Sequence, residues 1–204
     1  MIGFKLREEP PTFDERCRKR GRAWLAENPG EARPHDYWTE FEPDLRNAFG
    51  GLCAYCAMRI MKGQVDHFRP VALLRQEQRQ ELAYEWGNFR YGEGVLNGKK
   101  WKHVVLDPFD VRAGWFRIQL PSLQLEPTEL VPEDFRALAE FTIKKLGLRD
   151  SEVVVRYRRE WFGMYQSGEL TVEGLRRVAP LIADAVERDL RGGKDWKQFA
   201  RGGE

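Results

Sequence analysis

The chain has few cysteines and histidines, and neither sign of charge dominates it. It contains 3 Cys and 3 His, and 34 Lys and Arg residues nearly balance 32 Asp and Glu residues, which leaves a net charge of +2. A small, odd number of cysteines without a secretory context argues against a disulfide framework. The near balance of charge excludes a histone-like basic arm and an acidic tail, because each needs a large net charge.

Long apolar runs, repeats and biased segments are missing as well. No run of about 18 apolar residues occurs, which excludes an apolar helix that spans a membrane. The first residues, MIGFKLREEPPTFDER, lack the apolar core of a signal peptide. No phosphate-binding loop of the form Gly-x-x-x-x-Gly-Lys-Ser/Thr is present, so any energy-dependent control is expected to come from another protein. These absences predict a soluble, cytoplasmic protein with no membrane partner.

Aromatic residues are plentiful, which argues against a disordered chain. There are 7 Trp and 12 Phe among 204 residues, and disordered segments are usually poor in aromatics. This length predicts one compact domain, with or without an appendage. Within residues 1–50 the pattern predicts a helix over 12–27, begun by a capping box of Thr12 and Glu15, and then a Pro-rich surface connection.

Short mixed elements are expected in residues 51–130 and helices in residues 131–204. In the central region, apolar pieces alternate with turn formers, which predicts a two-stranded ribbon within 53–70. A helix is expected at 72–84 and a loop at 86–98. Three strands are expected at 104–106, 115–120 and 123–125. In the C-terminal region a helical period predicts helices near 135–146, 153–165 and 171–190. The sequence therefore predicts an α+β fold, with helical regions flanking a mixed centre.

The segment from Cys53 to Lys102 contains residues able to support hydrolysis of a phosphodiester. Asp66 and His67 place a hard carboxylate ligand beside an imidazole that can act as a base near neutral pH. Successive residues of a strand point to opposite faces of the sheet, so one of the two can hold a metal ion while the other faces a water molecule.

Amides and cations follow the Asp-His pair. Asn88 and Asn97 lie in a Gly-rich stretch and offer neutral amide oxygens. A carboxylate and an amide leave Mg²⁺ most of its coordination sites for water and a phosphate oxygen, as this ion prefers. The candidate contacts to a nucleic-acid backbone are the cations Arg69, Lys99, Lys100 and Lys102, three of which flank Trp101. Together these groups indicate metal-assisted phosphodiester cleavage.

In their order and spacing these residues resemble the HNH endonuclease family. That family has a Cys-x-x-Cys, a strand carrying Asp-His, an Asn in the next loop, and a His or Asn on a short helix. The matching residues here are Cys53 and Cys56, Asp66 and His67, Asn88, and Asn97 followed by Lys100. The strings VDHFRP, YEWGNF and LDPF are further similar to the small HNH nucleases that accompany ATPases in anti-phage systems of the Septu and retron type.

The resemblance implies a ββα-metal core, in which a ribbon bears Asp66 and His67 and a short helix begins near Asn97. It further implies that His67 activates the attacking water and that Asn88 orients its imidazole. Asp66 and Asn97 would hold one Mg²⁺ or Mn²⁺ ion against the scissile phosphate. The implied substrate is DNA, and the implied partner protein is an ATPase.

One departure from the family concerns zinc. Its zinc-bearing members have a second cysteine pair before the final Asn or His, which completes four thiolates around a structural ion. Glu93 and Leu96 stand at these places here, and Cys17 is the only other thiol. Cys53 and Cys56 alone do not close a tetrahedral site, so structural Zn²⁺ is not expected.

Several of these residues also have simpler interpretations. Asn97-Gly98 is a strong signal for a two-residue hairpin turn. Cys53 and Cys56 can be two buried thiols, and a redox role for them would need a βαβ setting that the sequence does not indicate. Three tryptophans are most simply core aromatics, namely Trp86, Trp101 and Trp115.

Three functions therefore compete. The first is a metal-dependent HNH endonuclease, and the alternative is an inactive HNH-fold subunit that binds nucleic acid or acts as a scaffold. A thiol oxidoreductase ranks last, because it rests on two cysteines alone. The C-terminal helical region is not needed for the chemistry, and we expect it to hold the nuclease on a partner or substrate through Arg156, Arg158, Arg159, Trp161, Phe162 and Tyr165.

Overall fold

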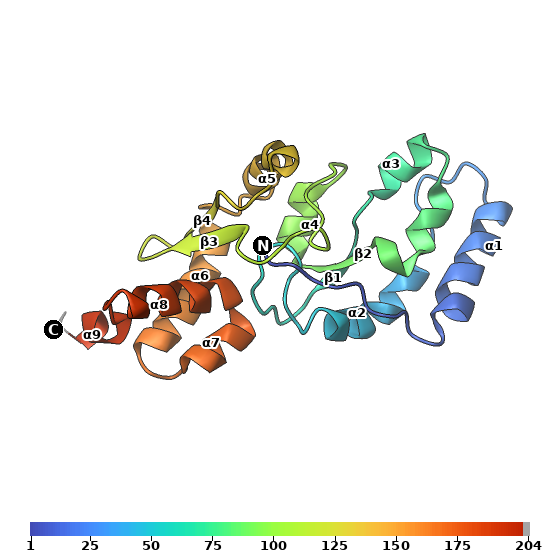
Figure 1. Ribbon diagram of the computed structural model, residues 1–204. Helices are drawn as coiled ribbons and strands as arrows, with labels where there is room; N and C mark the ends of the chain where they lie inside the picture. Colours follow the sequence, from blue (N-terminus) through green and yellow to red (C-terminus); the bar gives the residue numbers. More distant parts are fainter. Residues whose placement is uncertain (202–204) are drawn as a thin grey trace.

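The computed structural model describes residues 1–201, including the side chains of residues 1–198. Each half of the chain is built around one small antiparallel sheet (Figure 1). The first half comprises a π-helical stretch Asp14–Lys19, α1 (Arg20–Glu27), a 3-10 helix Tyr37–Phe41, α2 (Glu42–Ala48), β1 (Gln64–His67), α3 (Val71–Gln76), 3-10 helices Gln80–Tyr84 and Trp86–Asn88, β2 (Phe89–Gly92) and α4 (Gly94–Lys100). The second half comprises β3 (Phe116–Gln119), β4 (Gln124–Pro127), α5 (Glu133–Leu146), α6 (Glu152–Gln166), α7 (Val172–Val178), α8 (Pro180–Arg191) and α9 (Trp196–Arg201). The fold is thus α+β, as predicted.

The strands β1 and β2 and the helix α4 form a ββα unit in the middle of the molecule (Figure 1). The two strands are antiparallel, with Asp66 opposite Arg90 and His67 opposite Phe89. Glu93 follows β2 and caps α4, because its carboxylate accepts hydrogen bonds from the backbone N–H groups of Val95 (2.7 Å) and Leu96 (3.2 Å). This cap fixes the start of α4 directly after the strand.

The strand partner of β1 differs from the prediction. The prediction of a two-stranded ribbon within residues 53–70 is wrong. The partner of β1 is β2, which lies in the stretch 86–98 that was predicted as loop. All four residues of β2 are buried, so its sequence Phe-Arg-Tyr-Gly lacks the alternation that would have indicated a strand. Gly63 precedes β1 because a Cβ there would lie 2.2 Å from the ring of Tyr91 on the paired strand.

Two other predicted elements also differ. Residues 104–106 form no strand. Val105 and Leu106 are buried, and the Leu106 N–H donates to Thr142 Oγ1 on α5 (2.7 Å). The helix predicted over 171–190 breaks into α7 and α8 at Pro180, which lacks a backbone N–H and restricts the residue before it. Near the N-terminus, Thr12 makes no capping bond, since Phe13 already has helical backbone angles.

The C-terminal helices pack onto the rest of the chain through buried contacts. The Arg59 N–H donates to the Val178 carbonyl at the end of α7 (2.7 Å), and Arg188 of α8 donates to the Ile118 carbonyl of β3 (3.0 Å). A single apolar cluster contains residues from 1–50, 51–130 and the helices that follow. The ββα unit is therefore supported by the C-terminal half of the chain.

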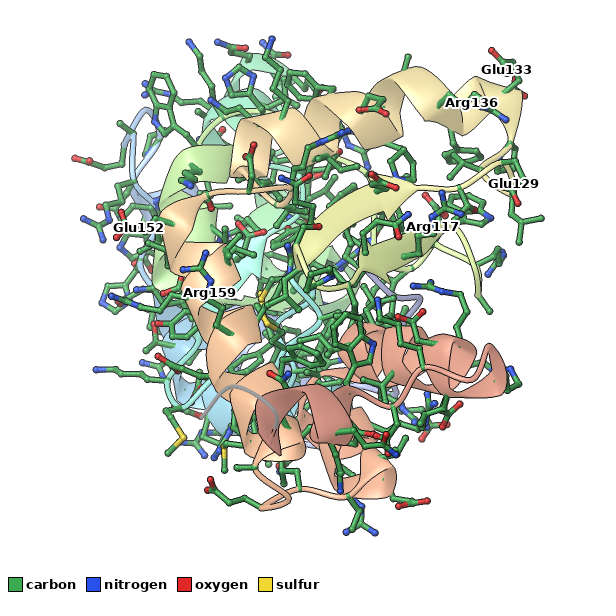
Figure 2. The ribbon with its side chains drawn as sticks, turned by 90° about the vertical axis from the view of Figure 1, so that its left-hand side faces the viewer. Arg117, Glu129, Glu133, Arg136, Glu152 and Arg159 are labelled. Atoms are coloured by element: carbon green, nitrogen blue, oxygen red, sulfur yellow. The ribbon has the colours of Figure 1, made fainter. Side chains whose placement is uncertain are left out.

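Three residues expected to form a docking surface on α6 lie in the core instead. Arg158 is 1% exposed and donates to the carbonyls of Leu123 (2.8 Å) and Leu148 (2.7 Å), while Phe162 and Tyr165 are also buried. The expectation that these three contact a partner is wrong, because they belong to the buried face of α6. Figure 2 shows that the surface of α5 and α6 carries both signs of charge, with Glu133 and Arg136 on α5 and Glu152 and Arg159 on α6.

No helix in the part of the chain that the structure describes is both long enough and apolar enough to cross a membrane.

Candidate active site

His67 lies at the end of β1, with its imidazole held between aromatic rings. Its ring centroid is 4.5 Å from that of Trp38 and 5.3 Å from that of Phe89, and both contacts are edge-to-face. Nε2 lies 2.9 Å from the backbone carbonyl oxygen of Ala83. The packing and the hydrogen bond together fix the orientation of the ring.

The contact with Ala83 also decides which nitrogen carries the proton. A carbonyl oxygen only accepts hydrogen bonds, so Nε2 of His67 must be the donor and Nδ1 keeps its lone pair. Among the described residues Nδ1 has no hydrogen-bond partner, and it is not one of the buried unpaired side-chain atoms. His67 as a whole is partly exposed. A neutral imidazole with a free Nδ1 is the form that a general base needs.

Burial lowers the pKa of His67 to about 4, and the nearby Lys100 ammonium acts in the same direction. The hydrogen bond to the Ala83 carbonyl opposes both effects. The imidazole is therefore neutral at pH 7, and in this environment it is a weaker base than a free histidine.

This shift predicts how the stability of the protein depends on pH. The unfolded chain binds a proton at His67 near pH 6.5 and the folded chain only near pH 4, so acid favours the unfolded state between these values. The free energy of unfolding should fall by about 3 kcal/mol as the pH is lowered through this window, on the scale of about 1.4 kcal/mol per pKa unit. Urea denaturation at several pH values measures it. His67→Phe should flatten the slope and His35→Phe, at an exposed histidine, should not; equal slopes for His67→Phe and the wild type would contradict the assignment.

Asn88 fixes the loop that carries the Ala83 carbonyl. Its Oδ1 accepts from the Arg69 N–H (2.8 Å), and its Nδ2 donates to the carbonyls of Leu82 (3.1 Å) and Arg69 (3.3 Å). It makes no hydrogen bond to His67, so it does not orient the imidazole directly, as the family resemblance implied. It acts on the imidazole through the backbone, because Leu82 adjoins Ala83.

Asp66 points away from His67, into a buried polar cluster under α4. Its side chain accepts from Lys100 Nζ at 3.0 Å on Oδ1 and from the Tyr55 hydroxyl on Oδ2. Asp66 is 3% exposed and Lys100 1% exposed. Burial raises the pKa of Asp66 against the attraction of Lys100, and burial lowers the pKa of Lys100 against the attraction of Asp66. Lys100 Nζ also donates to the backbone carbonyl of His67 (2.5 Å), which ties α4 to the end of β1.

Asn97 lies in the middle of α4, so the interpretation of Asn97-Gly98 as a hairpin turn is wrong. Its Nδ2 donates to Gln64 Oε1 (3.3 Å). Gln64 and Asp66 share one face of β1, and Asn97 and Lys100 are three apart on α4. Two polar pairs therefore join the helix to the strand, Asn97 with Gln64 and Lys100 with Asp66.

In this arrangement the residues do not fit the expected divalent ion. Both carboxylate oxygens of Asp66 already have partners, one of them an ammonium, and the Asn97 amide is turned to Gln64. Within the described residues no three His, Cys, Asp or Glu side chains cluster as metal ligands would. An ion could bind Asp66 only after Lys100 had left it.

The four cations expected to bind nucleic acid lie in different environments. Lys100 is buried, so the prediction that it contacts a phosphate is wrong. Arg69 is ion-paired with Glu77 (2.6 Å) at the start of the β1–β2 loop. Lys99 is half-buried at the end of α4, and Lys102 is exposed just beyond it. Only the last two are cations at the surface without an ion-pair partner in the described chain.

Cys53 and Cys56 are buried thiols that interact with each other. The interaction with the Cys53 thiol, followed by burial, raises the pKa of Cys56. Burial also acts to raise the pKa of Cys53, but the Cys56 thiol and nearby backbone N–H groups lower it to about 7. No third ligand side chain joins the pair among the described residues.

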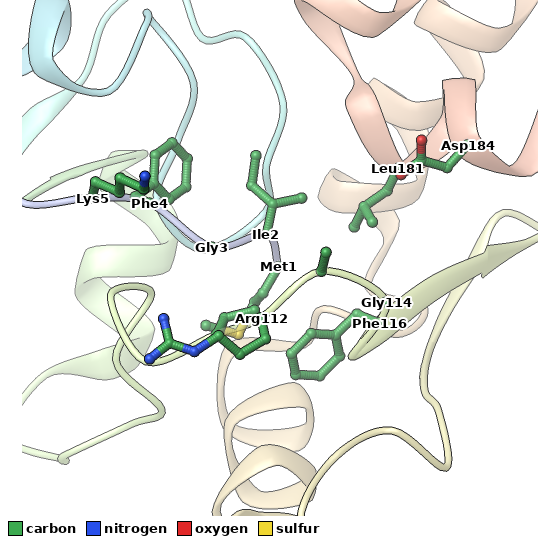
Figure 3. Close-up of a pocket in the computed structure, with 12 residues that line it drawn as sticks. Met1, Ile2, Gly3, Phe4, Lys5, Arg112, Gly114, Phe116, Leu181 and Asp184 are labelled. Atoms are coloured by element: carbon green, nitrogen blue, oxygen red, sulfur yellow. The ribbon is translucent and has the colours of Figure 1, made fainter.

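A hollow of about 450 Å³ lies beside β1 and adjoins the residues around His67. Trp38, which packs on His67, lines it, and so does Gln64, the partner of Asn97. Its charged lining residues are of both signs, with Arg33 and Lys62 opposed by Asp36 and Glu42. A second pocket of about 320 Å³ lies between residues 1–5, residues 111–116 and α8 (Figure 3), and none of the predicted site residues lines it.

Sequence reasoning missed three groups, two of them around His67 and one beside Asp66. Trp38 lies in the stretch predicted as a surface connection, where its neighbouring aromatic Tyr37 was a signal for packing. The carbonyl of Ala83 has no signature in a sequence, because every residue has one. Tyr55 lies within the Cys-x-x-Cys, and the hydrogen bond from its hydroxyl to Asp66 was not predicted.

No protein-family model matches the chain, and it has no match among curated proteins or among solved structures.

Proposed function

We propose that the chain is an HNH-type endonuclease that hydrolyses phosphodiester bonds of DNA with His67 as its general base. The observation that carries the proposal is the state of this imidazole. Nε2 of His67 donates to a backbone carbonyl, Nδ1 is free, and the ring ends the first strand of a ββα unit. The hollow beside Trp38 and β1 is the candidate place for the substrate.

The chemical step follows from this geometry. His67 Nδ1 takes a proton from a water molecule as the water oxygen forms a bond to phosphorus and the bond from phosphorus to the leaving oxygen breaks. The leaving oxygen takes up a proton from solvent. Lys100 holds the backbone carbonyl of His67, and Asn88 holds the loop that bonds to Nε2, so both act as positioning residues.

The resemblance implies a Mg²⁺ or Mn²⁺ ion bound to Asp66. In the described residues the ammonium of Lys100 lies against that carboxylate instead. The reaction is tested with purified protein on plasmid DNA, single-stranded DNA and RNA, in Mg²⁺, in Mn²⁺ and in chelator, with His67→Ala beside the wild type. Cleavage that depends on His67 supports the proposal, and cleavage that is the same in both proteins contradicts it.

The closed Asp66–Lys100 pair favours a second candidate, an inactive HNH-fold subunit that binds nucleic acid or serves as a scaffold. In an HNH fold that has lost catalysis, the carboxylate that once held the ion can be paired with an ammonium instead. Asp66 is buried against Lys100 in this way. Binding of DNA without cleavage under every cation condition would support this candidate over the nuclease.

An ATPase partner and a role in anti-phage defence are also proposals, and they rest on the resemblance to Septu- and retron-type nucleases. We expect the chain to co-purify with an ATPase of the Septu or retron type when both are expressed together. The remaining candidates on α6 for that contact are the exposed Arg156 and Arg159 and the half-buried Trp161, because Arg158, Phe162 and Tyr165 are buried. Double substitution of the two arginines by serine should weaken co-purification; unchanged recovery would exclude this face.

A further inference from the structure

Trp101 stands out because it is a large aromatic residue held in solvent. It is 68% exposed, whereas each of the other six tryptophans is buried or half-buried, so its expected place in the core is wrong. It comes directly after α4, one residue beyond Lys100, whose ammonium bonds to the His67 carbonyl. The exposed ring therefore lies next to the element that supports the candidate general base.

The backbone of Trp101 is in an unfavourable conformation, with φ of 47° and ψ of −116°. A bulky residue with positive φ is a conformational outlier, and such outliers persist only where neighbouring structure imposes them. Here the Trp101 N–H donates to the Asn97 carbonyl (3.0 Å), and the His103 N–H donates to the Lys100 carbonyl (2.9 Å). The ring is thus presented to solvent by a backbone that is fixed on both sides.

One lysine contacts this ring, and three more lie near the end of α4 and in the last turn of α5. Lys102 Nζ lies 4.6 Å from its centroid, and Lys99 reaches the Leu146 carbonyl at the end of α5 (3.4 Å). Two more lysines, Lys144 and Lys145, lie in the last turn of α5. None of these four lysines forms an ion pair within the described residues, so their charge is available to an anionic ligand.

We infer that Trp101 is a stacking platform for an unpaired base of single-stranded nucleic acid, with Lys99 and Lys102 on the flanking phosphates. This inference rests on the proposed function, and it names the class of its substrate. An exposed aromatic ring among lysines is the pattern of single-strand binding, because every base offers a face for stacking and every phosphate a charge. A protein partner fits less well, since lysine is depleted in protein interfaces.

Binding is measured in a His67→Ala background, so that the oligonucleotide is not cleaved. Fluorescence anisotropy gives Kd for a labelled single strand and for the duplex of the same sequence. Trp101→Ala should weaken single-strand binding about 5- to 150-fold, the range known for loss of one stacked base. Duplex binding should change less than about two-fold, since paired bases do not present a face to a side chain. Trp101→Phe keeps an aromatic face and should retain most of the affinity.

Leu130→Ala, at another exposed apolar residue, is the matched control and should change neither Kd. Circular dichroism and Tm verify that each variant is folded. Unchanged single-strand binding by Trp101→Ala, or an equal loss on single strand and duplex, overturns the inference, as does a protein that binds neither. A wild type that binds single strands through Trp101 but cleaves no substrate leaves the platform standing and refutes the nuclease.

Discussion

Replacing His67 by alanine is expected to slow cleavage of DNA by about 10²–10⁴-fold, the usual effect of removing a general base. The change removes the free Nδ1 that accepts the proton of water, and it leaves the Asp66–Lys100 pair in place. The loss should appear in kcat rather than in KM, because the imidazole contributes to the chemical step. Initial rates of plasmid nicking across a range of DNA concentrations separate the two.

A matched control comes from a second histidine near α4. His103 is half-buried and packs against Phe141 (5.9 Å between ring centroids), so His103→Ala also removes an imidazole from an aromatic contact. It should leave kcat unchanged. Added imidazole should restore part of the activity of His67→Ala. If His103→Ala loses as much activity as His67→Ala, the assignment of the base is wrong.

Replacing Lys100 by methionine is expected to have the largest effect on stability. It leaves the Asp66 carboxylate buried without its ammonium, and removing one partner of a buried ion pair typically costs about 3–5 kcal/mol. For a chain of this size the loss corresponds to a fall in Tm of about 6–20 °C. Lys102→Met, at an exposed lysine two residues away, should change Tm by no more than about 1–2 °C.

The same variant tests the relation between Lys100 and the metal ion implied by the resemblance. Without the ammonium, the Asp66 carboxylate has no cationic partner and can coordinate a divalent ion. Binding of Mn²⁺ or Mg²⁺ to the folded protein should therefore raise the Tm of Lys100→Met. The wild type should show a much smaller rise. Combining Lys100→Met with Asp66→Asn removes the unpaired charge and should recover much of the lost stability and abolish the metal effect. An equal rise in Tm for wild type and variant would show that Lys100 does not compete with the ion.

Around the candidate site, the sequence predicted on which face of the strand each residue lies, but few of the contacts. Alternation along a strand correctly separated Asp66 and His67 onto opposite faces. The strand that pairs with theirs was not predicted, because β2 lies in the stretch expected as loop. The start of α4 was placed too late, because the cap belongs to Glu93, which was considered only as a substitute for cysteine. The pairing of Lys100 with Asp66 was missed because a lysine in a basic run is usually at the surface.

In the C-terminal half, the sequence predicted where a helix lies but not which side chains of the helices are buried. The helical period and Gly147 marked α5 correctly, and Gly147 does take up the left-handed conformation that ends the helix (φ 65°). The same pattern did not say which residues of α6 face inward, since Arg158 is a charged side chain in an apolar environment. It is satisfied by backbone carbonyls of the β3–β4 and α5–α6 connections, which approach it only in the folded chain.

Asn88 has a consequence for the length of the polypeptide between the two strands of the ββα unit. Its bonds to Arg69 and Leu82, with the Phe68 N–H donating to the Asn88 carbonyl (2.7 Å), join the two ends of the segment that contains α3. Because the ends are held together, doubling the number of residues between them would add only about 0.6 kcal/mol of closure entropy. The exposed turn after α3, at Gln78, is therefore a place where chain can be inserted while the imidazole of His67 keeps its position.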